Sequence, residues 1–375
     1  MTSSTGWSAK AGALLGAICL ALAGCGADQE RQGSSLPARD GRVPIAVFPI
    51  ENLSGRPAPT DELRGLVVRS LEGRGFQALD EESLAAFMAR HRVRYTGGVD
   101  QGIAQALQKE SGVEGVLITS LELYSEENPP KISLTSRLVS VGENPGILWM
   151  DGVGLAGDDA PGLLALRLIE DPATLARKAV ESLAISLQAT QDRGAGKEDM
   201  KSTKKKFHPK VSYRSDTFDP EKKHTIAIVP FLNRSERRFA GDIVALNFAR
   251  GLRRFDQFEI IEPGVVRRQL LALRVIMTEG ITLSQSDAVL TLLSADLVLT
   301  GKVIDYQDYV GVLGTPKVDF SAQLIERKSR KVVWSSVSYN QGDDGVFFFD
   351  SGRVNTANAM VSQMIRAIGE AVLKE

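Results

Sequence analysis

The stretch IAIVPFLNRS at residues 226–235 decides the fold, because the chain carries a second stretch of the same kind, IAVFPIENLS, at residues 45–54. Each is an apolar run typical of a buried strand, and each then reaches a proline, an asparagine and a serine that favour a turn. Self-similarity at a long spacing is the sequence signature of a duplicated structural unit. The two stretches therefore predict that the chain contains one unit twice.

More matches follow in the same order on either side of a polar stretch near the middle of the chain. Residues 75–80 match 257–262, residues 96–99 match 278–281, residues 116–124 match 298–306, and Trp149 falls near Trp334 after a small gap. A single match carries little weight, whereas an ordered series at a near-constant offset indicates duplication. We therefore align almost the whole first half with the second.

The periodicity of apolar residues predicts the same elements in both halves. Apolar residues recur at helical spacing in residues 63–71 and 244–255, and they alternate with polar residues in residues 317–324, as in a strand with one wet face. Residues 329–331 predict a turn into another strand, and the apolar stripe of residues 357–368 predicts a final helix. The fold class expected is α+β, with two tandem repeats of a mixed-sheet α/β sandwich (β-α-β-α-α-β-β-β-α) joined by a polar linker.

These patterns divide the chain into five parts. They are a signal peptide at residues 1–24, a lipidated tether at 25–42, a first domain at 43–190, a basic linker at 191–223 and a second domain at 224–375. The tether and the linker are polar and lack apolar periodicity, which is typical of segments without a core of their own. The linker lysines form either a solvated connection or a strip that touches anionic lipid or cell-wall polymer.

The first residues carry a targeting signal. Lys10 precedes an apolar run at residues 11–23, which is too short for a stable membrane-spanning helix of about 20 residues. The run ends in Leu22-Ala23-Gly24-Cys25, which resembles the bacterial lipobox, where a peptidase cuts before a cysteine that receives lipid. The resemblance implies a lipoprotein lipidated on Cys25. The alternative is an ordinary signal peptide that happens to end near a cysteine.

The cysteine count agrees with this interpretation. Cys19 leaves with the signal peptide and Cys25 is consumed by the lipid, so no disulfide is possible within the mature chain. Gly26 stands where lipoproteins retained in the inner membrane carry an aspartate, which favours the outer membrane. We therefore expect a lipid-anchored protein of the outer membrane that faces the periplasm.

Three segments of the second half resemble one family. They are PFLNRS at residues 230–235, DLVLTGKV at 296–303 and KVVWS at 331–335, and they look like the CsgG and TolB amino-terminal-domain superfamily. The resemblance covers nearly all of the second half and, more loosely, residues 43–190. It implies α+β sandwiches that act as periplasmic binding and assembly modules and not as enzymes. The first half departs from the pattern, with Ile50-Glu51-Asn52 at the end of its first strand.

The residue types that usually carry catalysis form no recognisable pattern. His91, His208 and His224 lack metal-ligand spacing, and the sequence holds no nucleophile elbow, phosphate loop or dinucleotide fingerprint. The acid pairs at residues 126–127, 158–159 and 343–344 lie among glycine, proline or asparagine, so solvated turns are expected. A formal net charge of -1 does not indicate nucleic acid. We expect no enzyme, no cofactor and no metal.

Residues 342–349, GDDGVFFF, form the candidate partner-binding segment. Successive side chains of a strand point to opposite faces, so Phe347, Phe348 and Phe349 cannot easily enter one core. At least one is expected near the surface beside Asp343, where an aromatic anchor suits a protein interface. The alternative is that Phe347 and Phe349 cap the core while Phe348 packs on the first half.

Three functions remain open. The first is a lipid-anchored periplasmic protein-interaction module that recruits or regulates an envelope assembly, binds envelope proteins and can form a homo-oligomer. The second is an auxiliary lipoprotein subunit of a secretion or transport complex. The third is a hydrolase or a small-ligand receptor, which requires an enclosed pocket with convergent polar groups. The tether, the internal repeat and the lack of a recognisable catalytic motif favour the first function.

Overall fold

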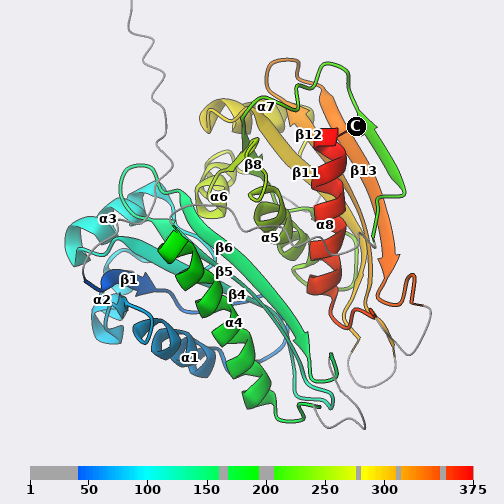
Figure 1. Cartoon of the computed structure of the whole chain (residues 1–375). Coiled ribbons are helices and arrows are strands. Elements are labelled where there is room, and N and C mark those ends of the chain that lie inside the picture. The colour runs from blue at the N-terminus through cyan, green and yellow to red at the C-terminus, as the bar shows by residue number, and fades with distance from the viewer. Residues whose placement is uncertain are drawn as a thin grey trace, which may run out of the picture. The chain divides into compact units, whose positions relative to one another are not determined.

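The computed structural model describes residues 41–159, 168–193, 207–275, 280–309, 314–346 and 352–374. These residues belong to one compact unit that holds two mixed β-sheets, each flanked by helices (Figure 1). None of the helices in these ranges is both long enough and apolar enough to cross a bilayer. Residues 1–40, which include the expected signal peptide, Cys25 and nearly all of the tether, lie outside the described residues.

The first sheet follows the predicted order of elements. Its strands run β3-β1-β4-β5-β6, with β1 parallel to β3 and β4, and with β4, β5 and β6 antiparallel. The strands are β1 (Val43–Val47), β2 (Glu51–Asn52, beside β4), β3 (Phe76–Ala78), β4 (Gly115–Ser125), β5 (Lys131–Ser140) and β6 (Ile147–Ala156). The helices are α1 (Thr60–Glu72), α2 (Glu81–Arg90), α3 (Gln101–Ser111) and α4 (Pro172–Arg193). We call these elements the first repeat.

The second sheet has the same strand order with one strand added. It runs β10-β8-β11-β12-β13-β7, with β9 beside β11. The strands are β7 (Val211–Arg214), β8 (His224–Ile228), β9 (Leu232–Asn233), β10 (Phe258–Ile260), β11 (Leu297–Gln307), β12 (Lys317–Glu326) and β13 (Val332–Gln341). The helices are α5 (Ala240–Leu252), α6 (Pro263–Ala272), α7 (Leu283–Leu292) and α8 (Ala357–Lys374). The α+β fold class with two sheet-bearing parts is confirmed, and we call these elements the second repeat.

The expected linker, residues 191–223, is structured in part. Helix α4 continues to Arg193, and β7 pairs antiparallel with β13 at the edge of the second sheet. Phe207 and Phe218, on either side of β7, are buried in the second hydrophobic core. Residues 207–223 therefore belong to the second repeat, because two apolar anchors and the pairing of β7 with β13 fix a segment whose composition is otherwise polar. Residues 194–206 lie outside the described residues.

The asparagine and the serine of the repeated stretch build the same turn in both repeats. The backbone N–H of Ser54 donates to Asn52 Oδ1 at 3.0 Å, and that of Ser235 donates to Asn233 Oδ1 at 3.0 Å. In both turns the asparagine amide then donates to a backbone carbonyl four residues on. Such side-chain bonds replace the backbone ladder where the strand ends, which explains why both residues recur.

Each repeat buries its apolar residues on both sides of its sheet. Helices α1 and α4 cover one face of the first sheet, and α5 and α8 cover one face of the second (Figure 1). Helices α2 and α3, like α6 and α7 in the second repeat, pack on the opposite face beside the parallel strands. This leaves the opposite face of the three long antiparallel strands, and the two repeats differ in what covers it.

Candidate interaction surface

In the first repeat, the remaining face of β4, β5 and β6 is covered by the second repeat. Helices α5 and α8 both contact β6, and Leu53 and Met150 of the first repeat belong to the hydrophobic core of the second. Helix α5 lies between two sheets, and eleven of its 13 residues are buried. The two repeats therefore share one continuous interior, which we call the repeat interface.

A buried ion pair crosses the repeat interface. Arg137 of β5 donates to both carboxylate oxygens of Glu262 at 3.0 Å each, and neither side chain is exposed. Arg137 also donates to the carbonyl of Gly97 at 2.6 Å. Burial lowers the pKa of Arg137, but the adjacent Glu262 carboxylate outweighs this effect and the pKa is raised overall. A bidentate pair has a demanding geometry, so it fixes how the repeats meet.

A second buried carboxylate lies farther along the repeat interface. Glu122, at a β-bulge of β4, accepts hydrogen bonds from Thr135 at 2.6 Å and from Asn247 and Asn358 on the helices of the second repeat. Burial raises the pKa of Glu122, and the hydrogen bond from Thr135 and the charge of Arg250 oppose that rise. Helices α5 and α8 are therefore tied to the first sheet by polar contacts as well as by packing.

Glycines let the two repeats approach closely. A Cβ added to Gly98 would lie 2.7 Å from Cα of Gly264 at the start of α6. A Cβ added to Gly154 of β6 would lie 3.3 Å from the backbone nitrogen of Ala359, and one on Gly152 would overlap the guanidinium of Arg250. Where one backbone approaches another this closely, glycine is required.

Within the described ranges no helix covers the matching face of the second sheet, and this face carries exposed apolar side chains. They are Val211 (60% exposed), Tyr213 (53%), Ile304 (44%), Val337 (43%) and Tyr339 (36%). The register sets Val211 opposite Val337, and Val337 is opposite Ser321 of β12, so these positions share one side of the sheet. We call this side the open face. Large apolar side chains left exposed on one side of a sheet are typical of an interaction site.

A hollow of about 290 Å³ lies on the open face. Its floor is formed by strands β11, β12 and β13, and its wall by Leu232, Gly280 and Ile281. Lys302 and Gln323 line it from neighbouring strands. Lys302 is exposed, and among the described residues its side chain makes no ion pair or hydrogen bond. The hollow therefore offers a cationic group beside neutral hydrogen-bonding side chains.

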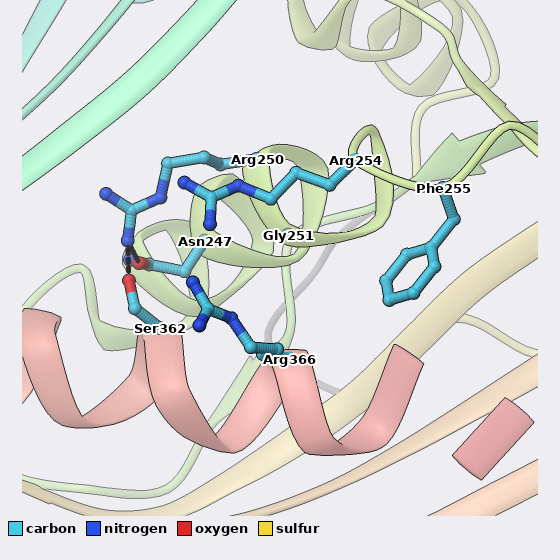
Figure 2. Close-up of a pocket in the computed structure, with 7 residues that line it drawn as sticks. All are labelled: Asn247, Arg250, Gly251, Arg254, Phe255, Ser362 and Arg366. Carbon is cyan, nitrogen blue, oxygen red and sulfur yellow. Dashed lines mark hydrogen bonds between the residues drawn. The ribbon is translucent and has the colours of Figure 1, made fainter. Parts of the chain in front are cut away.

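A much smaller pocket between α5 and α8 gathers three arginines (Figure 2). Arg250 donates to Asn247 Oδ1 at 2.7 Å and to the hydroxyl of Ser362, and Arg254 lies 3.7 Å from Asp151 of the first sheet. The cavity volume is about 20 Å³, which is room for about one water molecule. We interpret Arg250 and Arg254 as links that join the two helices to each other and to the first sheet. The pocket is lined by Asn247, Arg250, Gly251, Arg254, Phe255, Ser362 and Arg366.

The predicted site residues fall only partly within the described residues. Asp343 lies in the turn after β13, where the hydroxyl of Thr315 donates to its carboxylate at 3.4 Å. Phe347, Phe348 and Phe349 lie outside the described residues, as does Cys25, so their roles stay predictions. Asp343 is not among the residues that line the hollow on the open face.

The histidines and the acid pairs take the places that the sequence suggests. His91 follows the end of α2, His224 begins β8, and each acid pair lies in or directly beside a turn or a bend. In the part of the chain that the structure describes, no group of three or more histidine, cysteine, aspartate or glutamate residues is arranged to hold a metal ion.

The residues of the repeat interface and the open face are not among the predicted site residues. A signal exists for two of them, because Glu122 and Arg137 are charges inside strands made mostly of apolar and hydroxyl side chains. A charge at such a position indicates a buried partner. No local sequence pattern predicts that Gly152 and Gly154 lie against helices, because the residues they contact belong to the other repeat.

Comparison with known proteins finds similarity in structure alone. No protein-family model matches the chain, and no curated protein matches its sequence. The chain is similar to PelC from Paraburkholderia phytofirmans, solved as a dodecamer, at 18% identity and a TM-score of 0.31, covering 44% of this chain and 95% of that one. It is also similar to lipoprotein GNA1162 from Neisseria meningitidis (18% identity, TM-score 0.29, covering 39% and 99%) and to the LpoB C-terminal domain from Salmonella enterica (16%, 0.26, 34% and 87%). Each alignment spans less than half of this chain, and similarity at this level carries no function over.

Proposed function

We propose that this chain is a lipid-anchored periplasmic protein-interaction module of the cell envelope, which recruits or regulates an envelope assembly. Leu22-Ala23-Gly24-Cys25 supports the lipid anchor, and Gly26 supports the outer membrane. The shared core of the two repeats supports a rigid platform. In this proposal the chain is not an enzyme, and its partner is another envelope protein.

The observation that carries the proposal is the open face. In the first repeat the same side of the sheet is removed from water by α5 and α8, whereas in the second repeat large apolar residues stay exposed there. Covering apolar surface stabilises a complex by about 25 cal/mol for each Å² removed from water. A partner seated on the open face would bury the exposed Val337 and Tyr339 together.

The anchor is tested by replacing Cys25 with serine. The variant should move from the membrane fraction to the soluble envelope fraction, because its signal peptide can be read but no sulfur is available for lipid. A variant that still fractionates with membranes on its own would contradict the anchor. Cys19→Ser is the matched control, since Cys19 leaves with the signal peptide and its loss should change nothing.

The role is tested by the mass of the particle released from membranes by mild detergent. If the chain is a recruiting or regulating module, the released particle should have the mass of this chain alone or of this chain with one partner protein. A particle that always contains the full set of components of a transport system would replace the proposed role with that of an auxiliary subunit.

A further inference from the structure

The hollow on the open face corresponds to a site that is filled in the first repeat. The strand register makes Gln323 the counterpart of Arg137. Gln323 pairs with Thr300 and Arg137 pairs with Ile118, and Thr300 and Ile118 are equivalent positions of the two repeats. Gly280 and Ile281 correspond to Gly98 and Val99 in the matched stretches TEGI and TGGV. The walls and floor of the two sites are therefore built from equivalent positions.

In the first repeat this site holds the acidic start of a helix. Glu262 caps α6 and its carboxylate pairs with Arg137, while Gly264 packs against Gly98. The backbone N–H of Val99 also donates to Glu262 at 3.4 Å. The occupant is thus a carboxylate at a helix N-terminus, placed against a cation of the sheet.

The second repeat also has a cation at this site, but it is carried by the neighbouring strand. Where the first repeat has Ser120 beside Arg137, the second has Lys302 beside Gln323. The side chains of Thr300, Ser321 and Ser335 around them are neutral. A carboxylate is the group that this arrangement would bind, because a cation flanked by neutral donors complements one negative charge.

The chain's own first repeat does not fit this site. The helix face that covers the first sheet carries Asn358, Ala359 and Ser362. The N-terminal cap of α8 at Thr356 corresponds to that of α4 at Asp171, so the matching positions of α4 are Ala173, Thr174 and the exposed Arg177. Packing Arg177 against the open face, which already carries the cation Lys302, would cost its hydration without supplying the carboxylate that this site needs.

The open face also leaves less space for packed helices than the matching face of the first sheet. Val337 and Tyr339 occupy the register positions of Gly152 and Gly154, where a Cβ on the first sheet would meet Arg250 of α5 and Ala359 of α8. Head-to-tail association of copies through the repeat interface is therefore disfavoured on both surfaces, and the occupant must differ from α1 and α4.

We propose that the hollow on the open face binds an acidic helix N-terminus of a partner protein, with Lys302 pairing the carboxylate and Val337 and Tyr339 packing on an uncharged side of the helix. The inference deepens the proposed function, on which the identity of the partner as an envelope protein rests. The binding chemistry itself does not depend on the lipid anchor.

The first test uses a labelled peptide of residues 260–273 as the probe, because this segment fills the equivalent site in the first repeat. Titrated with the full mature chain at low salt, it should bind saturably, and a Glu262→Gln peptide should bind about tenfold more weakly, as expected for loss of one charge-assisted bond. Lys302→Glu in the protein should weaken binding at least as much. Lys178→Glu, on the outer face of α4, should change nothing.

Two results of this titration would overturn the inference. One is no saturable binding at millimolar peptide. The other is binding that ignores both the Glu262→Gln and the Lys302→Glu changes. Lys302 is exposed, so Lys302→Glu should melt like the wild type, and a melting control separates lost binding from lost folding.

The second test places a photo-crosslinking amino acid at Tyr339 in cells. It should yield a product with another protein, crosslinked within a helix that begins with aspartate or glutamate, and Lys302→Glu should reduce its yield about tenfold. A product with a second copy of this chain, or a yield unchanged by Lys302→Glu, would refute the inference. Failure of Cys25→Ser to leave the membrane would instead refute the lipid anchor while leaving the peptide result intact.

Discussion

Replacing Arg137 with methionine should destabilise the protein by about 3–5 kcal/mol, because it leaves a buried carboxylate without its cation. Neither Arg137 nor Glu262 is exposed, and two bonds of 3.0 Å are lost. Glu262 would keep the backbone N–H groups of Gly264 at 3.2 Å and Val99 at 3.4 Å. Since these remaining bonds are long and compensate the charge only weakly, the upper end of the range, about 5 kcal/mol, is expected.

Urea unfolding followed by tryptophan fluorescence measures this loss in each repeat. Trp149 lies in β6 and Trp334 in β13, so a Trp149→Phe or Trp334→Phe background reports one repeat at a time. In the wild type both reporters should give the same transition, because the repeats share a core. In Arg137→Met the two transitions should separate, because the contact that joins the repeats is weakened.

A double-mutant cycle and an exposed pair control this prediction. Arg137→Met with Glu262→Met should be less destabilised than the sum of the single changes by about 1–3 kcal/mol, since the second change removes the orphaned charge. Arg90→Met, which breaks an exposed pair with Glu110 at 2.9 Å, should cost less than about 1 kcal/mol. Additive effects at Arg137 and Glu262, or a loss as small as that at Arg90, would refute the reasoning.

Four further outcomes are expected. Gly98→Ala should lower stability by about 1–3 kcal/mol, because its Cβ meets the Cα of Gly264, and thermal unfolding will show whether the contact can relax. Burial raises the pKa of Glu51 above 4.5, so the folded state holds this proton more tightly and stability falls as pH rises from that value; Glu51→Gln should flatten the fall in a pH series of urea titrations. Limited proteolysis should cut first between residues 195 and 206, ahead of the buried Phe207 and the paired strand β7, and leave two fragments of similar size; a first cut within residues 207–223 would count against this assignment. Phe348→Ser should lower partner recovery from cells without lowering the melting temperature, and a melting drop of several degrees with recovery falling only in proportion to folded protein would remove Phe348 as a docking residue.

The duplication could be predicted because its signals are local. The apolar runs at residues 45–54 and 226–235, the alternation at 317–324 and the stripe at 357–368 each arise from the period of one strand or helix. Paired asparagine and serine side chains mark the same turn because the bonds they make span only a few residues. The element order followed from these periods alone.

The segment after α4 shows where composition misleads. Residues 191–223 are rich in lysine and suggest a linker, yet Phe207 and Phe218 are buried and β7 extends the second sheet. Two apolar residues in a polar segment give no periodic signal. Their partners lie far along the chain, in the core that β13 and α8 help to form.

The sequence by itself determined which elements form, how they are ordered and that the order occurs twice, since each depends on contacts within one element or between neighbours. Only the tertiary structure decided that α5 and α8 cover both sheets, that Arg137 meets Glu262, and that the matching face of the second sheet stays open. Every strand has two faces, and periodicity alone does not say what covers each one. That choice depends on groups more than a hundred residues apart, such as Arg137 and Glu262, whose pairing exists only once the chain has folded.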